Sequence, residues 1–161
     1  MISKRLDLSL RKNKGKSLMK RYKEMFVLSG FQETELKSVN IEKSDEIKSK
    51  IKAYFPKVQK QVEVLSDICT FRDSRLLKLT FAEVSGCDEC FIFSDDVEYC
   101  GMYIVSAKSA QEYCLNVAKL GYSNTCFLVN TNFRFSFTIN YHIDGSVELK
   151  NKFDIQLKSL A

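Results

Sequence analysis

The sequence predicts an α+β domain in which N-terminal helices pack against one face of a largely antiparallel sheet of about six strands. In residues 17–70, apolar side chains recur with the helical period of about 3.6. After Arg75 the apolar period changes to about 2, the spacing of a half-buried strand. Helices that precede a run of strands are typical of the α+β class. We therefore expect one domain over residues 1–161, helical in 17–70 and mainly strands in 76–157.

The first expected helix begins at Lys16 and ends at Gly30, which can adopt the left-handed conformation of a helix cap. Its apolar stripe consists of Leu18, Tyr22, Met25 and Phe26. The preceding residues 1–16 are polar and basic and contain Gly15. We expect this segment to be a flexible basic lead or a short helix.

Two more helices are expected before residue 70. Ser44 is expected to begin the second, because Asp45 and Glu46 would then complement the helix dipole in the first turn. Pro56, the only proline, ends this helix or opens the next one. The third helix carries an apolar stripe on Val58, Val62, Leu65 and Cys69.

The C-terminal part predicts strands with one helix among them. Period-2 patterns and apolar runs place strands at 77–81, 90–93, 99–105, 125–129, 133–142 and 147–157. Ser109 and Glu112 form a capping box for a helix that Gly121 ends, between the third and fourth strands. We expect turns at 94–98 and at Asp144-Gly145, the latter a typical hairpin sequence.

The six cysteines are expected to be reduced, buried thiols. The chain shows no export signal, is longer than disulfide-stapled scaffolds, and has several cysteines in apolar segments. Cys87 and Cys90 form a C-x-x-C pair, but a structural zinc site normally needs a second pair of ligands. A thioredoxin-like redox pair would begin a helix, whereas this one enters a strand. We therefore expect no metal and no cofactor.

Residues that usually carry catalysis are sparse. His142 is the only histidine, and no local sequence pattern pairs it with a cysteine nucleophile. Phosphate-binding glycine loops, the G-x-S-x-G elbow and the H-E-x-x-H motif are absent from the sequence. Paired carboxylates stay open as an alternative, but the sequence predicts that the protein is not an enzyme.

Charge is divided unevenly along the chain, whose net charge is +5. Residues 1–60 carry 16 Lys and Arg against 7 Asp and Glu, whereas residues 61–161 carry 9 against 13. No base lies between Lys78 and Lys108, where the acids are Glu83, Asp88, Glu89, Asp95, Asp96 and Glu98. Such a stretch is either solvated surface or a surface that attracts a basic protein. Its spacing does not fit a calcium loop, which needs alternating oxygen ligands and a central glycine.

We expect the acids around the 94–98 turn to bind a protein partner, together with two tyrosines on the strand that follows. Acids in a turn can reach a partner without breaking a strand, and aromatic side chains are frequent anchors at interfaces. The expected partner-binding residues are Asp88, Glu89, Asp95, Asp96, Glu98, Tyr99 and Tyr103.

Nucleic-acid binding by the basic N-terminal helices is the alternative function. The bases that could neutralise phosphates are Lys12, Lys14, Lys16, Lys20 and Arg21. The strand at 133–137 could offer aromatic rings for stacking, although its alternating Phe residues are typical of a buried face. The acidic stretch would also repel a phosphate backbone, so nucleic acid is the less favoured partner.

Three stretches of the C-terminal half are residues 99–105 (YCGMYIV), 121–127 (GYSNTCF) and 135–141 (FSFTINY). They resemble small bacterial immunity proteins that are encoded beside polymorphic or contact-dependent growth inhibition toxins. The resemblance covers roughly residues 75–157 and lies in the general sequence pattern of the strands more than in any functional motif. The basic N-terminal helices depart from the acidic immunity proteins that pair with basic nucleases.

The resemblance implies a protein without enzymatic activity that binds and neutralises the C-terminal toxin domain of a neighbouring effector, often a nuclease such as a tRNase. These families share no interface motif, so no binding residue carries over. No apolar run approaches the roughly 20 residues that span a bilayer, and the N-terminus lacks the apolar part of a secretory signal. We expect a cytoplasmic protein, without membrane contact, that forms a heterodimer with its toxin domain.

Overall fold

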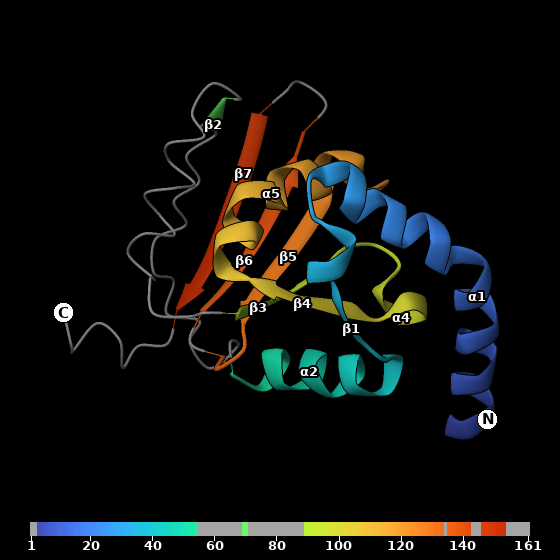
Figure 1. Cartoon of the computed structure of the whole chain (residues 1–161). Helices are drawn as coiled ribbons and strands as arrows, with labels where there is room; N and C mark the ends of the chain where they lie inside the picture. The colour runs from blue at the N-terminus through green and yellow to red at the C-terminus, as the bar shows by residue number, and fades with distance from the viewer. Residues whose placement is uncertain (1–2, 55–68, 71–88, 134, 143–145, 154–161) are drawn as a thin grey trace.

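The computed structural model describes residues 3–54, 69–70, 89–133, 135–142 and 146–153 (Figure 1). In this part of the chain seven strands form one sheet in the order β1-β4-β3-β5-β6-β7-β2, with all neighbours antiparallel. The strands are β1 (Lys37–Val39), β2 (Cys69–Thr70), β3 (Glu89–Phe93), β4 (Met102–Ser106), β5 (Thr125–Asn130), β6 (Phe135–Tyr141) and β7 (Ser146–Phe153). The prediction of an α+β fold with a largely antiparallel sheet is confirmed.

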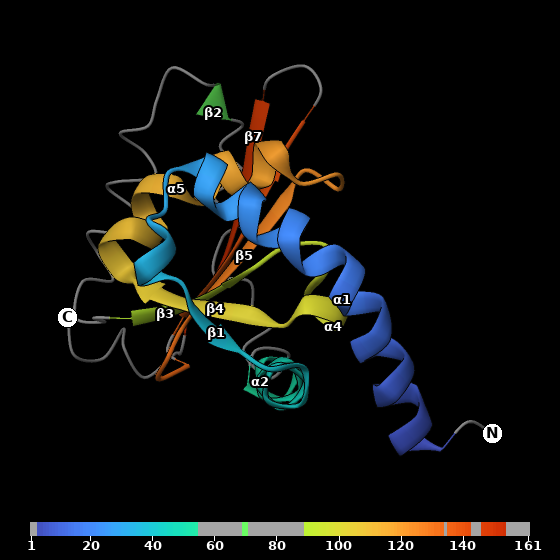
Figure 2. The same cartoon turned by 45° about the vertical axis from the view of Figure 1, so that its right-hand side comes forward.

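Helices cover both faces of this sheet. Those in the described residues are α1 (Lys4–Ser29), the short 3₁₀ helix η1 (Glu33–Glu35), α2 (Ile41–Tyr54), α4 (Val97–Cys100) and α5 (Ala107–Leu120). α1 and α5 pack on one face and α2 packs on the other (Figures 1 and 2). The expectation that the N-terminal helices share one face is therefore wrong. The expected position of α5, between the third and fourth predicted strands, is confirmed.

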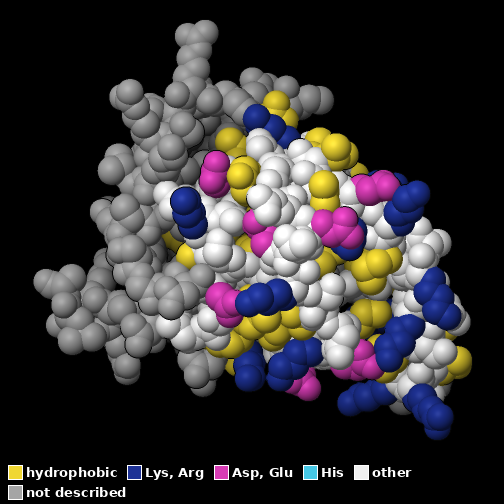
Figure 3. Space-filling model, in the orientation of Figure 1, with side chains coloured by type: hydrophobic (Ala, Val, Ile, Leu, Met, Phe, Trp, Pro, Cys, Tyr) yellow, Lys and Arg dark blue, Asp and Glu magenta, His cyan; other side chains and the backbone are white. Residues whose placement is uncertain are grey.

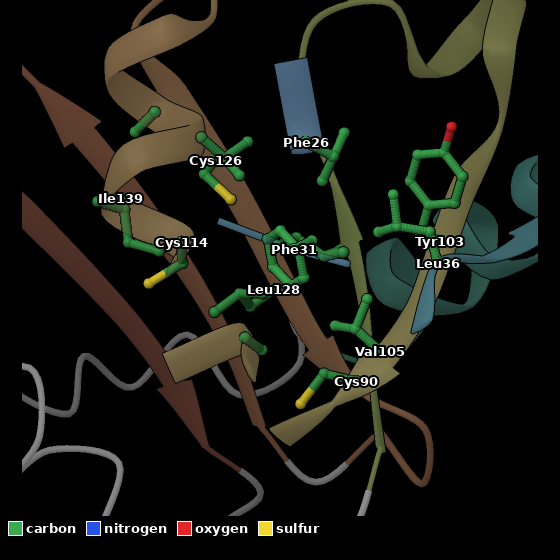
Figure 4. Close-up of a cluster of buried hydrophobic side chains, with 14 of the residues drawn as sticks. Phe26, Phe31, Leu36, Cys90, Tyr103, Val105, Cys114, Cys126, Leu128 and Ile139 are labelled. Carbon is green, nitrogen blue, oxygen red and sulfur yellow. The ribbon is translucent and has the colours of Figure 1, made fainter. Parts of the chain in front are cut away.

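Two apolar clusters result from this arrangement, one on each face of the central strands. In β3, Cys90 and Ile92 belong to the cluster with α1 and α5, whereas Phe91 and Phe93 belong to the cluster with α2. The continuous apolar sequence of β3 therefore fits a strand that is covered on both sides. The larger cluster, shown in Figure 4, includes Phe26, Phe31, Leu36, Tyr103, Val105, Cys114, Cys126, Leu128 and Ile139.

α1 begins earlier than the sequence predicts. It is 26 residues long and starts at Lys4 rather than at Lys16. Ser3 caps it, because its Oγ accepts a hydrogen bond from the backbone N of Leu6 at 3.2 Å. The expectation of a flexible lead over 1–16 is wrong, and the alternative of a helix holds from Lys4 onward.

Polar contacts and one glycine hold this N-terminal half of α1. Gly15 is buried against the backbone carbonyl of Tyr99 on α4, and a Cβ at this position would collide with that oxygen. Arg11 forms an ion pair with Asp45 on α2 at 2.7 Å. Such contacts leave no apolar stripe in the sequence, which is why periodicity does not reveal the start of this helix.

The start of α2 also differs from the prediction. The helix begins at Ile41, where Asn40 Oδ1 accepts a hydrogen bond from the backbone N of Lys43 at 2.8 Å. Ser44, the predicted cap, is instead buried inside the first turn, and its Oγ donates to the backbone O of Val39. The capping role therefore belongs to Asn40, which sequence reasoning did not weigh.

α5 begins three residues before the predicted position and ends where expected. Ser106 is the cap, because its Oγ accepts a hydrogen bond from the backbone N of Ser109 at 3.0 Å. The capping box predicted at Ser109 is therefore wrong. Gly121 follows the last residue of the helix, as the sequence predicts.

The segment before β4 is helical rather than extended. The backbone N of Cys100 donates to the backbone O of Asp96 at 2.8 Å, which closes the single turn of α4. Gly101 then adopts φ 77°, a conformation that side chains disfavour, and β4 begins at Met102. The expected strand at 99–105 is therefore correct only from Met102.

The C-terminal strands largely follow the predicted alternation. β5 and β6 are confirmed, and Phe137 and Ile139 of β6 are buried in the larger cluster. Phe133 lies outside β6 with φ 58°, so the strand starts two residues later than expected. β7 pairs with β6 in the antiparallel register that a hairpin requires, for example Tyr141 opposite Val147.

Some predicted features lie outside the described residues. They are the third helix over 58–68, the strand at 77–81, the Asp144-Gly145 turn, the strand end at 154–157, and the side chains of Cys87 and Asp88. Cys69, which was expected to end the third helix, belongs to strand β2.

Candidate protein-binding groove

A hollow of about 190 Å³ opens between the C-terminal half of α1 and two loops. The first loop follows β3 and contributes Asp95 and Asp96, and the second follows α5. We call this hollow the α1 groove, and its lining is Arg21, Tyr22, Glu24, Met25, Leu28, Asp95, Asp96, Leu120, Gly121 and Tyr122. The α1 groove thus brings together three segments that are distant in the sequence.

The wall of the groove depends on Gly121 and on the carboxylate of Asp95. A Cβ on Gly121 would lie 2.9 Å from Ser94 Oγ and 3.0 Å from Asp95 Oδ2, so a side chain here would push the loops apart. Asp95 accepts hydrogen bonds from the backbone N of Ser123 at 3.0 Å and from its hydroxyl. Asp95 therefore holds the second loop in place with both of its oxygens.

The rim of the groove is apolar and exposed. Leu28 is 77% exposed, Tyr122 67% and Leu120 50%. Large apolar side chains with this exposure, gathered beside charged groups, are typical of protein-binding surfaces. Arg and Tyr, which are enriched among the residues that dominate binding energy, are both present here as Arg21 and Tyr122.

The groove carries more negative than positive charge. Three carboxylates, those of Glu24, Asp95 and Asp96, line it with the single guanidinium of Arg21. Partial burial raises the pKa of the Tyr122 hydroxyl, and the negative charges of Asp96 and Asp95 raise it further. The carboxylates of Asp95 and Asp96 are therefore close enough to act on the Tyr122 hydroxyl at the rim of the groove.

The structure separates the acids that the sequence places in one stretch. Glu89 begins β3 and forms an ion pair with Lys37 of β1 at 2.6 Å. Asp95 and Asp96 follow the other end of the same strand, and five residues of extended chain span roughly 17 Å. The expected single acidic patch is therefore wrong: Glu89 and the α1 groove are at opposite ends of β3.

Glu98 and Tyr99 lie on α4, outside the lining of the groove. Glu98 is exposed, and its backbone O accepts a hydrogen bond from Arg11 Nε at 2.8 Å. The ammonium of Lys14 lies 4.0 Å from the centre of the Tyr99 ring, which is a cation–π contact. Both residues thus contact the N-terminal half of α1.

Tyr103 was expected to anchor a partner, and the structure contradicts this. Its side chain is 3% exposed and stacks on Tyr22 with ring centres 5.8 Å apart. Burial raises its pKa to about 12. Because Tyr103 is part of the core, a partner could reach it only if the core opened.

Sequence reasoning missed the apolar rim and Arg21 as a member of the groove. Leu28 is outside the apolar stripe predicted for this helix, and Gly121 and Tyr122 enter the prediction as a helix end and as part of the 121–127 stretch, not as a surface. Large apolar residues on both sides of a helix-ending glycine are the sequence feature that could have indicated an exposed apolar rim here. Only the fold brings these positions next to Asp96.

The described residues outside the groove include four buried thiols and one exposed imidazole. No group of three His, Cys, Asp or Glu side chains among the described residues could hold a metal ion. Cys90, Cys100, Cys114 and Cys126 are free and buried, as expected for these four. Burial raises the pKa of Cys100 to about 11 and that of Cys114 to about 12, so their reactive thiolate forms are suppressed at neutral pH. His142 is exposed just after β6.

None of the helices in the described residues has the length and apolar character that crossing a membrane requires. Comparison with known proteins adds no family: no family model, no curated protein and no solved structure matches this chain. The resemblance to bacterial immunity proteins therefore rests on the strand sequences quoted above.

Proposed function

We propose that this protein is an immunity protein, which binds and neutralises the C-terminal toxin domain of a cognate contact-dependent or polymorphic toxin. It acts as a stoichiometric cytoplasmic binder and not as an enzyme. The observation that carries the proposal is the α1 groove, where exposed Leu28, Leu120 and Tyr122 surround a hollow beside Asp96.

The size of the groove favours a protein partner over a small molecule. Pockets that enclose cofactors or metabolites measure about 300–1,000 Å³. The groove measures about 190 Å³ and lies open beside apolar side chains. A hollow of this size suits one or two side chains of a protein surface.

The charge of the groove favours a basic partner. A nuclease such as a tRNase is positively charged where it binds phosphate, so carboxylates on an inhibitor attract it and speed its approach. Asp96 lies in the groove, and Glu98 lies nearby on α4. The groove thus combines an apolar contact area with the sign of charge that a nuclease toxin would select.

Binding of nucleic acid through α1 is less well supported. Figure 3 shows Lys and Arg side chains along α1 and over α2, with acidic side chains among them. Lys12 pairs with Glu42, and Lys14 lies over the ring of Tyr99. Acids next to these bases neutralise part of their charge, which weakens the attraction of a phosphate backbone.

Co-expression with the toxin domain encoded beside this gene tests the proposal. We expect restored growth and a one-to-one complex. The Leu28→Gln variant should bind that domain at least about tenfold more weakly. Val27→Gln is the matched control. Val27 precedes Leu28, is rotated by about 100° around the helix axis, and does not line the groove.

Two outcomes would contradict the proposal. A chain that neither restores growth nor binds the toxin domain is not its immunity protein. A mobility shift of labelled tRNA by the purified chain at low salt, abolished by Lys16→Gln with Lys20→Gln, would favour the nucleic-acid alternative instead.

A further inference from the structure

We propose that the α1 groove receives one lysine or arginine side chain of the partner protein. Its aliphatic stem would lie between Leu28 and Leu120, and its charged group would pair with Asp96. This inference rests on the proposed function, since it names the chemistry that the partner must present to the same groove.

Asp96 is the less engaged of the two carboxylates in the first loop. Both oxygens of Asp95 accept hydrogen bonds from Ser123. Asp96 accepts one long contact, from the Tyr122 hydroxyl at 3.4 Å. Asp96 also occupies the cap position of α4 without a side-chain cap hydrogen bond, so its carboxylate oxygens are not used to hold that helix.

The apolar part of the groove fits the stem of a basic side chain. Leu28 and Leu120 are both at least half exposed and line the same hollow as Asp96. Lysine and arginine bury their methylene stems along apolar surface while the charged head stays with polar groups. A hollow of about 190 Å³ has room for one such side chain.

The charge of the groove disfavours a negatively charged side chain of the partner. A partner carboxylate would meet three carboxylates and one guanidinium in the lining of the groove. A neutral aliphatic side chain would contact Leu28 and Leu120 but would desolvate Asp96 and leave it only the long contact from the Tyr122 hydroxyl, which costs free energy. A basic side chain can pack its stem against the two leucines and pair its charge with the carboxylate.

Selection of random peptides displayed on phage against the immobilised full chain tests this inference without the toxin. We expect selected peptides to be enriched in Lys or Arg next to an aliphatic residue. Their affinity should fall at least about tenfold in both Asp96→Asn and Leu28→Gln. Asn keeps the shape and the capping ability of Asp96, and thermal melting checks that each variant is folded.

Matched controls lie outside the groove. Glu112→Gln removes an exposed acid on α5, and Val27→Gln changes an exposed apolar residue on another face of α1. Both should bind the selected peptides as the unchanged chain does. Raising the salt concentration should weaken binding to the unchanged chain more than to Asp96→Asn.

The inference is overturned if no peptide is selected, if the selected peptides lack basic residues, or if they bind Asp96→Asn equally well. Its failure can be distinguished from failure of the immunity function. A toxin domain that binds the unchanged chain and Asp96→Asn equally would leave the immunity role intact and remove the basic side chain from the groove. If basic peptides bind the groove but the toxin domain does not bind the chain, the basic side chain in the groove is supported and the immunity role is contradicted.

Discussion

The two halves of α1 are held to the protein by different forces. In the C-terminal half, Tyr22 and Phe26 are buried among the aromatic side chains of the larger cluster. In the N-terminal half, Arg11 pairs with Asp45 of α2, and Gly15 lies against the backbone of α4. One helix thus passes from an apolar attachment to a polar one.

The difference shows which attachments a sequence reveals. Apolar contacts of a helix repeat every three to four residues, so the C-terminal half has a visible pattern. Arg11 lies 3.8 Å from Asp7 in the same helix, but its hydrogen-bond partners are 34 and 87 residues away along the chain, and nothing near Arg11 in the sequence indicates them. Four substitutions test this comparison, in order of expected effect.

Phe26→Ala should have the largest effect, because Phe26 is fully buried at the apolar half. We expect a loss of about 3–5 kcal/mol in the free energy of unfolding, from lost burial and the cavity left behind. Urea unfolding followed by circular dichroism measures it, with the half-exposed Val27→Ala as control. A loss no larger than that of the control would show that the apolar half is not what anchors α1.

Gly15→Ala should destabilise the protein by about 1–3 kcal/mol, because the new methyl group meets the carbonyl of Tyr99. In an exposed helix the same change would stabilise by about 1 kcal/mol. Asn13→Ala, at an exposed position two residues earlier, provides that comparison. If both substitutions stabilise, the close approach of α1 to α4 is absent in solution.

Arg11→Gln should cost about 1–2 kcal/mol, because it removes two hydrogen bonds to Asp45 and one to the backbone O of Glu98. Lys20→Gln is the control, since Lys20 is highly exposed and its nearest carboxylate oxygen, on Glu24, is 3.9 Å away. Equal stability of the two variants would mean that Arg11 does not hold the N-terminal half.

Asp45→Asn should change how stability depends on pH. The hydrogen bond from Arg11 lowers the pKa of Asp45 in the folded protein. The contribution of the Asp45 carboxylate to the free energy of unfolding is therefore fully present above the ordinary carboxyl pKa of about 4. It is lost as the pH falls through the lowered pKa of the folded protein. The difference between the unchanged chain and the variant should be largest near pH 7 and should shrink below about pH 4.

Unfolding free energies measured between pH 3 and 7 test this dependence. Glu46→Gln is the control, because Glu46 pairs with Lys43 on the exposed surface of α2 and should show a smaller difference. A pH-independent difference for Asp45→Asn would mean that the ion pair with Arg11 does not form in solution.

Local patterns determined the fold class and the elements whose signals are short-range. Alternation placed β5 and β6, a continuous apolar run placed β3, and Gly121 marked the end of α5. Each of these signals lies within a few neighbouring residues, because side-chain period and capping chemistry are properties of the local chain.

Tertiary structure alone decided the start of α1, the face on which α2 packs, and the groove. The acids of the central stretch are close in sequence but lie at both ends of β3, because the extended chain of a strand separates its two ends. Leu28, Asp96 and Tyr122 form one groove only after the chain has folded. A contact between distant segments leaves no period in either of them, so the local sequence determined most of the elements, whereas packing determined the start of α1 and the site.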